Sequence, residues 1–196
     1  MEGSAKDDAA AESNPVIASV IRLQALTGAR GSEIRTARRS LIAIHETAGE
    51  GKKAKPIRTG TLTVIDPKEG GRKEIPLSVE AVSVIDSLPT IKGCDFVFPG
   101  RTLKEPIDIT TVMHWWSRHR GEAGLEGFRL HDLRHFVAGE LVAAGASLTQ
   151  IGELFGHKSA QTTMRYAYLD DSKKKELAAL VSGRITSMAR ASDTRA

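Results

Sequence analysis

Cysteine is almost missing from this chain of 196 residues, since Cys94 is the only one. A single thiol cannot form an intrachain disulfide, which excludes a disulfide-stapled scaffold and suits a reducing cytoplasm. Long apolar runs are also missing, and the N-terminus lacks the pattern of a signal peptide. The sequence therefore predicts neither a membrane span nor secretion, and it favours a cytoplasmic location.

Charge is modest and uneven along the chain. The net charge is +4, yet residues 1–14 hold four acids and one base, and residues 172–196 hold six bases and two acids. A basic chain is compatible with a nucleic-acid partner, although charge alone does not establish one. The length fits one domain with a core of its own, with or without short tails.

Hydrophobic periodicity predicts a mainly helical α+β fold with a small antiparallel sheet. Apolar residues recur at helical spacing in several segments, which are 16–26, 79–88, 109–116, 133–142, 148–155, 162–169 and 171–185. Alternation over residues 61–65 and 74–77, around a glycine-rich turn, predicts a hairpin. Residues 40–44 and 96–98 are expected to form further strands. Ser78, Asp108 and Ser147 are predicted N-caps.

Six polar residues, scattered along the chain, together suit one kind of substrate. They are Arg30, Lys68, His131, Arg134, His157 and Tyr166. A guanidinium group matches two phosphate oxygens with a planar fork, and a tyrosine is a nucleophile that can hold a phosphate covalently. The set predicts that DNA is cut and rejoined through a phosphotyrosyl bond.

The segments around these residues resemble the catalytic domain of the tyrosine recombinases, also called the phage integrase family. The motifs are Thr-Gly-x-Arg-x-x-Glu from Thr27, His-x-x-Arg-His from His131, Leu-x-Gly-His from Leu154, and a tyrosine nine residues after His157. Each is weak alone, but four in one order are specific. The resemblance covers about Val16 to Val181 and implies the fold of the DNA breaking-rejoining enzymes.

The resemblance also implies a domain organisation. We expect residues 1–14 to be a disordered acidic tail, 15–183 to be the catalytic domain, and 184–196 to be a basic tail that includes the end of the last helix. Family members usually carry an N-terminal core-binding domain, which we expect to be absent from this chain. Whether the chain is an excised domain or a minimal form stays open.

Two arginines and a tyrosine are expected to carry the central step. Arg30 and Arg134 suit the non-bridging oxygens of the phosphorane-like state, which carries two negative charges. Tyr166 is the predicted nucleophile, and it would form a 3′-phosphotyrosyl link. Tyr168 is its rival, but it stands where the family often has a histidine, and the spacing from His157 favours Tyr166.

Proton transfer and phosphate contact fall to the remaining three residues. His131 is a candidate general acid or base that assists the tyrosine proton. The resemblance gives His157 a hydrogen bond to the phosphate, and it gives the lysine of the hairpin turn the role of general acid toward the 5′-oxygen. Lys68 is the best match for that lysine, although Arg72 and Lys73 lie nearby.

Two further residues are expected to support the site. Glu33 lies one helical turn after Arg30, and the resemblance makes it a residue that orients the arginine, while an ordinary helix salt bridge is the alternative. His135 fits a satisfied structural histidine or a supporting role. His131 and His135 also form His-x-x-x-His, but the metalloprotease glutamate is missing, so we expect neither a metal nor another cofactor.

A basic cluster follows the Glu33 segment. Arg35, Arg38 and Arg39 are candidate contacts to DNA phosphates, or equally a solvated helix end. Arg72 in the hairpin is a further candidate DNA contact.

The function expected from these residues is that of a site-specific recombinase or integrase acting on duplex DNA. The resemblance implies four protomers on DNA, and we expect a monomer without it. Two alternatives stay open: religation of the same strand, as in a type IB topoisomerase, and a non-catalytic DNA-binding module. The target site, the direction of exchange and any accessory proteins are not indicated by the sequence.

Overall fold

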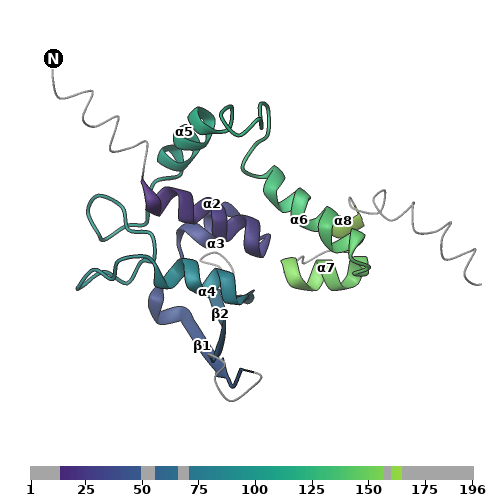
Figure 1. The fold of residues 1–196 in the computed structure, drawn as a ribbon, viewed down its shortest axis with the longest axis horizontal. Helices are drawn as coiled ribbons and strands as arrows, with labels where there is room; N and C mark the ends of the chain where they lie inside the picture. The colour runs from purple at the N-terminus through teal and green to yellow at the C-terminus, as the bar shows by residue number, and fades with distance from the viewer. Residues whose placement is uncertain (1–13, 50–55, 66–70, 157–159, 165–196) are drawn as a thin grey trace, which may run out of the picture. The chain divides into compact units, whose positions relative to one another are not determined.

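A computed structural model describes residues 14–49, 56–65, 71–156 and 160–164 (Figure 1). The chain divides into two units, residues 1–137 and 138–196, which are described separately. The first contains α2 (Pro15–Thr27), α3 (Gly31–Arg35), the 3-10 helix η1 (Arg39–Leu41), β1 (Ile42–Thr47), β2 (Ile57–Ile65), β3 (Arg72–Leu77), α4 (Val79–Asp86) and α5 (Ile109–His119). Helix α6 (Asp132–Ala143) crosses the division, and α7 (Leu148–Phe155) and α8 (Ala160–Met164) belong to the second unit.

The expected α+β class is confirmed, with a three-stranded antiparallel sheet in the order β1-β2-β3. Ile42 pairs with Leu62, and Ile65 pairs with Arg72 across the hairpin. The first strand begins later than the sequence predicts, because residues 39–41 form a 3-10 turn held at Ser40. There the backbone N–H and the hydroxyl of Ser40 both donate to the carboxylate of Asp95.

The strand expected at residues 96–98 is wrong. Phe98 is fully buried, but this segment makes only an isolated bridge between Phe96 and Arg38. Its backbone hydrogen bonds go to separate segments, since Val97 N–H donates to Ala37 O and Ile107 N–H donates to Phe98 O. Residues 96–98 are therefore buried without the regular backbone hydrogen bonds of a β-strand.

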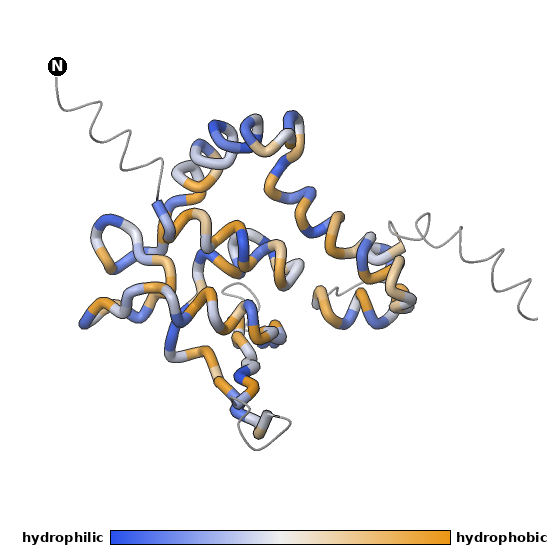
Figure 2. Tube along the Cα trace, viewed as in Figure 1, coloured by the Kyte–Doolittle hydropathy of each residue, from blue (hydrophilic) through white to orange (hydrophobic). Residues whose placement is uncertain are grey.

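The core of the first unit lies between α2, α4 and the sheet. Helix α4 packs against both α2 and β2, and Figure 2 shows apolar positions recurring along these elements. The core residues with at most 2% exposure on them are Ile17, Val20, Leu23, Leu62, Ile75, Leu77, Ala81 and Val82. Burying one large aliphatic side chain contributes about 1.5–3 kcal/mol, so this packing fixes the elements that carry the site.

Helix α2 ends where the sequence predicts a break. Asn14 caps it by accepting from Val16 N–H, with Pro15 in the first turn. At the other end Gly28 adopts the left-handed conformation, with φ 64°, and its N–H donates to Gln24 O. A glycine takes this conformation without steric cost, so the chain can turn sharply into the segment that contains Arg30.

Helix α5 differs from its expected packing. Asp108 caps it as predicted, but of the apolar residues at helical spacing in this segment, which are Ile109, Val112, Met113 and Trp116, only Val112 is fully buried. Met113 is 54% exposed. The indole N–H of Trp116 instead donates to Phe128 O, which ties the helix to the following loop.

The second unit contains the helix predicted at residues 148–155. Ser147 and Gln150 form a reciprocal capping box, and Gly156 ends α7 with φ 61°. Helix α8 (Ala160–Met164) overlaps the helix expected at 162–169 at residues 162–164. The rest of that expected helix and the last predicted helix lie outside the described residues. No helix in the described ranges is long and apolar enough to cross a bilayer.

Candidate active site

Arg30 stands at the N-cap of α3, two residues after the left-handed turn at Gly28. Its backbone is extended there, with φ −67° and ψ 147°. The preceding Ala29 N–H donates to the hydroxyl of Thr27, which is itself bonded to Leu23 O. This short loop is therefore held to the end of α2, and it presents a guanidinium side chain that is 47% exposed.

Glu33 lies in α3 and holds Arg30 at two points. One carboxylate oxygen accepts from the backbone N–H of Arg30 at 2.7 Å, and the other accepts from its Nη1 at 3.1 Å. The Glu33 side chain is only 10% exposed. The acid that the sequence predicts to support Arg30 is therefore in contact with it.

Lys73, on β3, is a second partner of Glu33, although the sequence indicates it only as an alternative to Lys68. Its Nζ donates to both carboxylate oxygens of Glu33, at 2.9 Å and 2.8 Å, and its side chain is 17% exposed. A signal was available in the sequence: Lys73 shares a face of β3 with the buried Ile75 and Leu77. A lysine at an inward position of an alternating strand indicates a buried partner.

Arg134 brings α6 to the same loop. It lies in the first turn of that helix and is 4% exposed, and its Nη1 donates to Gly28 O at 2.7 Å. Gly28 precedes Arg30 by two residues. The two arginines that the sequence predicts as a phosphate clamp are thus attached to one short segment.

The charges in this cluster influence one another. Burial would raise the pKa of Glu33, but hydrogen bonds from Lys73 and the Arg30 backbone, with the charges of both residues, hold it below its ordinary value. Burial lowers the pKa of Lys73 and outweighs the opposing contribution of Glu33, and the positive charges of Arg134 and Arg30 lower it further. These four groups, called the charged cluster below, are therefore close enough to influence one another's charge.

His131 and His135 lie beside the charged cluster. Their ring centroids are 5.1 Å apart, with the rings nearly perpendicular. The pKa of His131 is lowered from its ordinary value by partial burial, by His135 and by Arg134. A neutral imidazole at neutral pH is what a general base requires. Among the described residues, no group of three or more His, Cys, Asp or Glu side chains is placed to hold a metal ion.

Three predicted catalytic residues, Lys68, His157 and Tyr166, lie outside the described residues. Strands β2 and β3 are paired as far as Ile65 and Arg72, and Lys68 falls between these two residues in the sequence. Helix α7 ends at Gly156, immediately before His157. These three assignments stay predictions.

The basic cluster after α3 has protein partners. Arg35 Nη1 donates to Ile107 O, and Arg39 Nη2 donates to Leu88 O and Pro89 O. Arg38 lies 4.4 Å over the ring of Phe96 and pairs with Asp95. These contacts give the cluster a structural role that the sequence did not indicate, and its predicted contact with DNA, like that of Arg72, stays a prediction.

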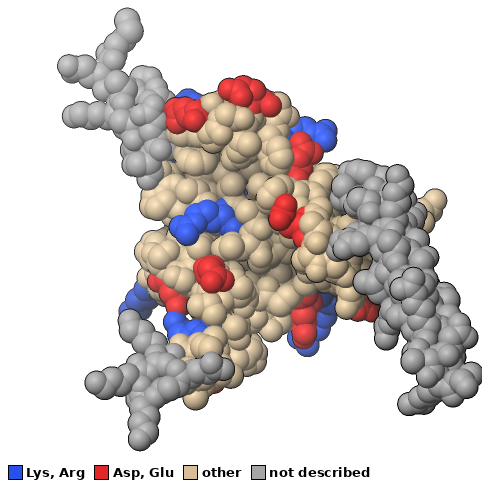
Figure 3. Space-filling model, turned by 45° about the vertical axis from the view of Figure 1, so that its right-hand side comes forward, with Lys and Arg blue, Asp and Glu red and all other residues tan. Residues whose placement is uncertain are grey.

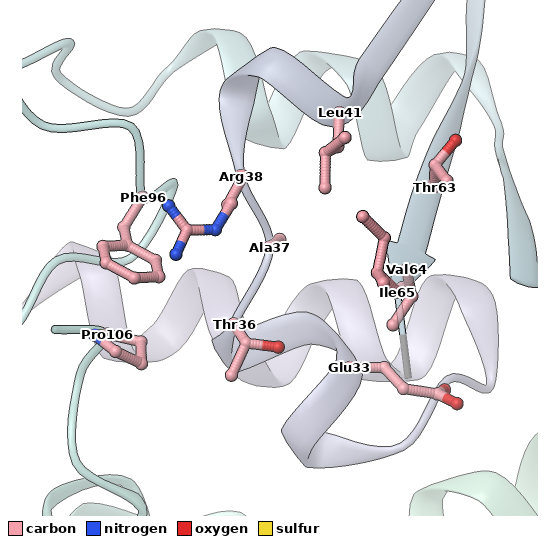
Figure 4. Close-up of a pocket in the computed structure, with 10 residues that line it drawn as sticks. All are labelled: Glu33, Thr36, Ala37, Arg38, Leu41, Thr63, Val64, Ile65, Phe96 and Pro106. Atoms are coloured by element: carbon pink, nitrogen blue, oxygen red, sulfur yellow. The ribbon is translucent and has the colours of Figure 1, made fainter. Parts of the chain in front are cut away.

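A groove of about 360 Å³ opens beside the basic cluster of Arg35, Arg38 and Arg39. Figure 4 shows the Arg38 guanidinium next to Phe96 on one side and the strand residues Thr63, Val64 and Ile65 on the other. Its lining is largely apolar and includes Glu33 but none of Arg30, Lys73 and Arg134. The groove therefore does not coincide with the charged cluster of Arg30, Glu33, Lys73 and Arg134. The hydrogen bonds within that cluster define the candidate site.

Surface charge does not by itself mark a nucleic-acid interface. On the face shown in Figure 3, lysine and arginine side chains of the coloured residues lie singly or in small groups, with acidic side chains between them. The case for a phosphate site rests on the cluster at Arg30 and Arg134.

Solved structures share this fold. The catalytic domain of bacteriophage HP1 integrase matches with a TM-score of 0.55 and 24% identity, over 85% of this chain and 82% of that one. The site-specific recombinase XerH, in a complex with its difH substrate, matches with a TM-score of 0.61 and 19% identity, over 78% of this chain and 42% of that one. The fold is therefore that of a tyrosine recombinase catalytic domain.

Sequence comparison gives the family. The model of the phage integrase family matches residues 7–173, and the chain belongs to that family. The integrase of Haemophilus phage HP1 is 26% identical over 164 residues, which cover 81% of this chain and 39% of that protein. The chain thus spans about two fifths of that relative. The match starts and stops at positions other than residues 15 and 183, so those domain boundaries stay predictions.

Proposed function

We propose that this chain is the catalytic domain of a site-specific recombinase that breaks and rejoins duplex DNA through Tyr166. One observation supports this above all: Arg134 is hydrogen-bonded to Gly28, at the loop that carries Arg30. One guanidinium group on this loop and a second that is hydrogen-bonded to it match the two charged oxygens of a phosphodiester. Membership of the phage integrase family supports the same chemistry.

The proposed first step is an in-line displacement at phosphorus. The phenolic oxygen of Tyr166 bonds to the scissile phosphorus while the bond to the 5′-oxygen breaks. His131 takes the phenol proton and Lys68 gives a proton to the departing 5′-oxygen, so that proton transfer balances. Arg30, Arg134 and His157 stabilise the charge on the non-bridging oxygens.

The second step is the reverse displacement by another strand. A 5′-hydroxyl attacks the phosphotyrosyl bond, the tyrosine leaves, and the DNA is joined without an external energy source, because the covalent link keeps the energy of the phosphodiester. We propose duplex DNA as the partner, four protomers on two duplexes during exchange, a monomer away from DNA, and a cytoplasmic location. Recombination and topoisomerase-like religation differ in the strand that supplies the 5′-hydroxyl.

A covalent trap tests the nucleophile without knowledge of the target site. The chain is mixed with a pool of nicked duplexes whose sequence beside the nick is randomised, so that the short 5′-hydroxyl strand diffuses away after cleavage. We expect protein–DNA adducts that survive denaturation, are lost in Tyr166→Phe and persist in the matched control Tyr168→Phe. Sequencing the trapped duplexes then gives the site.

Two outcomes would contradict the proposal. An absence of adducts with the wild-type chain would remove the enzymatic function and favour a DNA-binding module. Loss of the adduct in Tyr168→Phe, with retention in Tyr166→Phe, would move the nucleophile by two residues. A trapped duplex incubated with a second 5′-hydroxyl duplex should yield recombinant strands, and religation of the original strand alone would favour topoisomerase chemistry.

A further inference from the structure

Lys73 is a largely buried cation at the candidate site that the proposed mechanism does not use. Its Nζ spans both oxygens of Glu33, while the same carboxylate accepts from the backbone N–H and Nη1 of Arg30. The Lys73 side chain is 17% exposed, against 47% for Arg30. The arginine is therefore the cation open to a ligand, and the lysine is the one committed to the carboxylate.

The charged groups of this arrangement determine the net charge that faces a bound phosphate. With Arg30 and Glu33 alone, the carboxylate at 3.1 Å from Nη1 would cancel much of the guanidinium charge. Lys73 supplies a second cation to that carboxylate. Arg30, Lys73 and Arg134 carry three positive charges against the single negative charge of Glu33, which leaves a net charge of two, equal and opposite to that of the phosphorane-like state.

On the basis of the proposed function, we propose that Lys73 is a positioning residue for DNA cleavage. Through Glu33 it fixes the loop that carries Arg30, and it compensates the carboxylate so that the Arg30 guanidinium keeps its charge for the scissile phosphate. The lysine acts through Glu33 and Arg30, and the proton for the 5′-oxygen comes from Lys68.

Burial explains why one lysine has this effect. An uncompensated carboxylate in a mostly buried place is costly, and the cost falls on whichever cation remains next to it. Without Lys73, the carboxylate of Glu33, which already accepts from the backbone N–H and Nη1 of Arg30, would attract that guanidinium more strongly. That would draw the guanidinium away from the position in which it meets a phosphate.

The test is a double-mutant comparison on a duplex recovered from the covalent trap, with enzyme in excess. We expect Lys73→Met to slow adduct formation about 10- to 100-fold while DNA affinity changes only a few-fold. Adding Glu33→Gln removes the carboxylate charge and restores the net charge of two. The double variant should therefore cut at least about fivefold faster than Lys73→Met. Wild-type cleavage by Lys73→Met, or a double variant no faster than it, would overturn the inference.

A charge-altered substrate separates this role from a merely structural one. A methylphosphonate at the scissile position removes one negative charge from the transition state. The ratio of wild-type to Lys73→Met rates should therefore shrink on that duplex, whereas a folding defect would leave the ratio equal on both substrates. An equal ratio would overturn the inference.

A second substrate separates positioning from proton donation. A 5′-phosphorothiolate leaves as a thiolate and needs no general acid, so the defect of Lys68→Ala should vanish on it and that of Lys73→Met should remain. A Lys73→Met defect that vanishes there would make Lys73 the acid and overturn the inference. If Lys73→Met does not fold, Glu33→Gln and the double variant decide: rates within a few-fold of each other support the inference, and a far slower double variant overturns it.

The wild-type control distinguishes the two proposals. No adduct from the wild-type chain would remove the proposed function and this inference together. An adduct from the wild type, with Lys73→Met equally active, would remove the inference alone.

Discussion

Arg134 donates from Nη1 to the carbonyl of Gly28 at 2.7 Å, across 106 positions in the sequence. The bond is buried, and it fixes the first turn of α6 to the loop that presents Arg30. Because one protein group sets the position of both arginines, their spacing depends on a single loop conformation. The first two predictions follow from this bond.

Replacing Arg134 by lysine should abolish most cleavage while preserving the charge. A lysine offers one ammonium group, which cannot hold the Gly28 carbonyl and also reach two phosphate oxygens with a planar fork. We expect Arg134→Lys to lower the rate of covalent adduct formation about 100- to 1000-fold, with DNA binding largely kept. The matched control is Arg22→Lys at an exposed position of α2, which should cut like the wild type. Equal rates for Arg134→Lys and wild type would remove Arg134 from the clamp.

Gly28 should tolerate no side chain. Its φ of 64° places an added Cβ close to backbone, so Gly28→Ala should lower the free energy of unfolding by about 1–2 kcal/mol, measured in urea. It should also slow adduct formation, because the displaced carbonyl no longer fixes Arg134. Gly71→Ala is the control, since a Cβ there meets nothing within 4 Å and the residue is exposed. Similar losses in the two variants would argue against a special role for the turn.

The sequence predicts those parts of the fold whose signals are local. Both ends of α7 follow from Ser147 and Gly156, because a cap and a left-handed stop act within one helical turn. The cluster of Arg30 and Arg134 was predictable only through motifs of a family. The apolar run at residues 96–98 predicts a strand because buried apolar segments look alike in sequence whether or not they pair with a neighbouring strand. The actual hydrogen-bond partners of this segment, Ala37 and Ile107, are not indicated by any local pattern.

Lys73 shows the same limit at the site. Its alternation with Ile75 and Leu77 indicates an inward side chain, but no spacing rule connects it to a glutamate 40 positions earlier. The hairpin turn points to Lys68 instead, since a lysine that can donate a proton suits the departing 5′-oxygen. Only the tertiary contact distinguishes the lysine that holds a carboxylate from one that is solvated.

The pH dependence of cleavage should report His131. Its pKa lies below the ordinary 6.5 because of burial, His135 and Arg134. A base is active when deprotonated, so activity is kept above that pKa and is lost as the pH falls through it. We expect the acid limb of the second-order cleavage rate, which reports the free enzyme, to lie below pH 6.5 and to disappear in His131→Asn.

A second variant checks the cause of that shift. His135→Asn removes a charge that lowers the pKa of His131, so the acid limb should move toward higher pH. An acid limb above pH 6.5 in the wild type, or one that survives in His131→Asn, would assign the titration to another group.

Gly152 should control the helix that precedes the proposed nucleophile. It is buried in α7, and a Cβ added there would lie 2.8 Å from the hydroxyl of Thr163 in α8, one residue before Met164 ends that helix. Tyr166 follows Met164 by two residues. Gly152→Ala should therefore displace α8, destabilise the chain by about 1–3 kcal/mol and reduce adduct formation.

Repeating Gly152→Ala in a Thr163→Ala variant tests whether the contact with Thr163 causes the destabilisation. In Thr163→Ala the hydroxyl is gone and the next nearest atom, the Thr163 Cγ2 at 3.6 Å, is gone with it. Introducing Gly152→Ala in that background creates no close contact and gains helix propensity of up to about 1 kcal/mol, so the sign of the effect should reverse to stabilising. Urea unfolding of the four proteins of this cycle measures both steps. Because alanine is favoured over glycine inside any helix, an equal destabilisation in the two backgrounds would mean that the Gly152–Thr163 contact does not set the packing of α7 on α8.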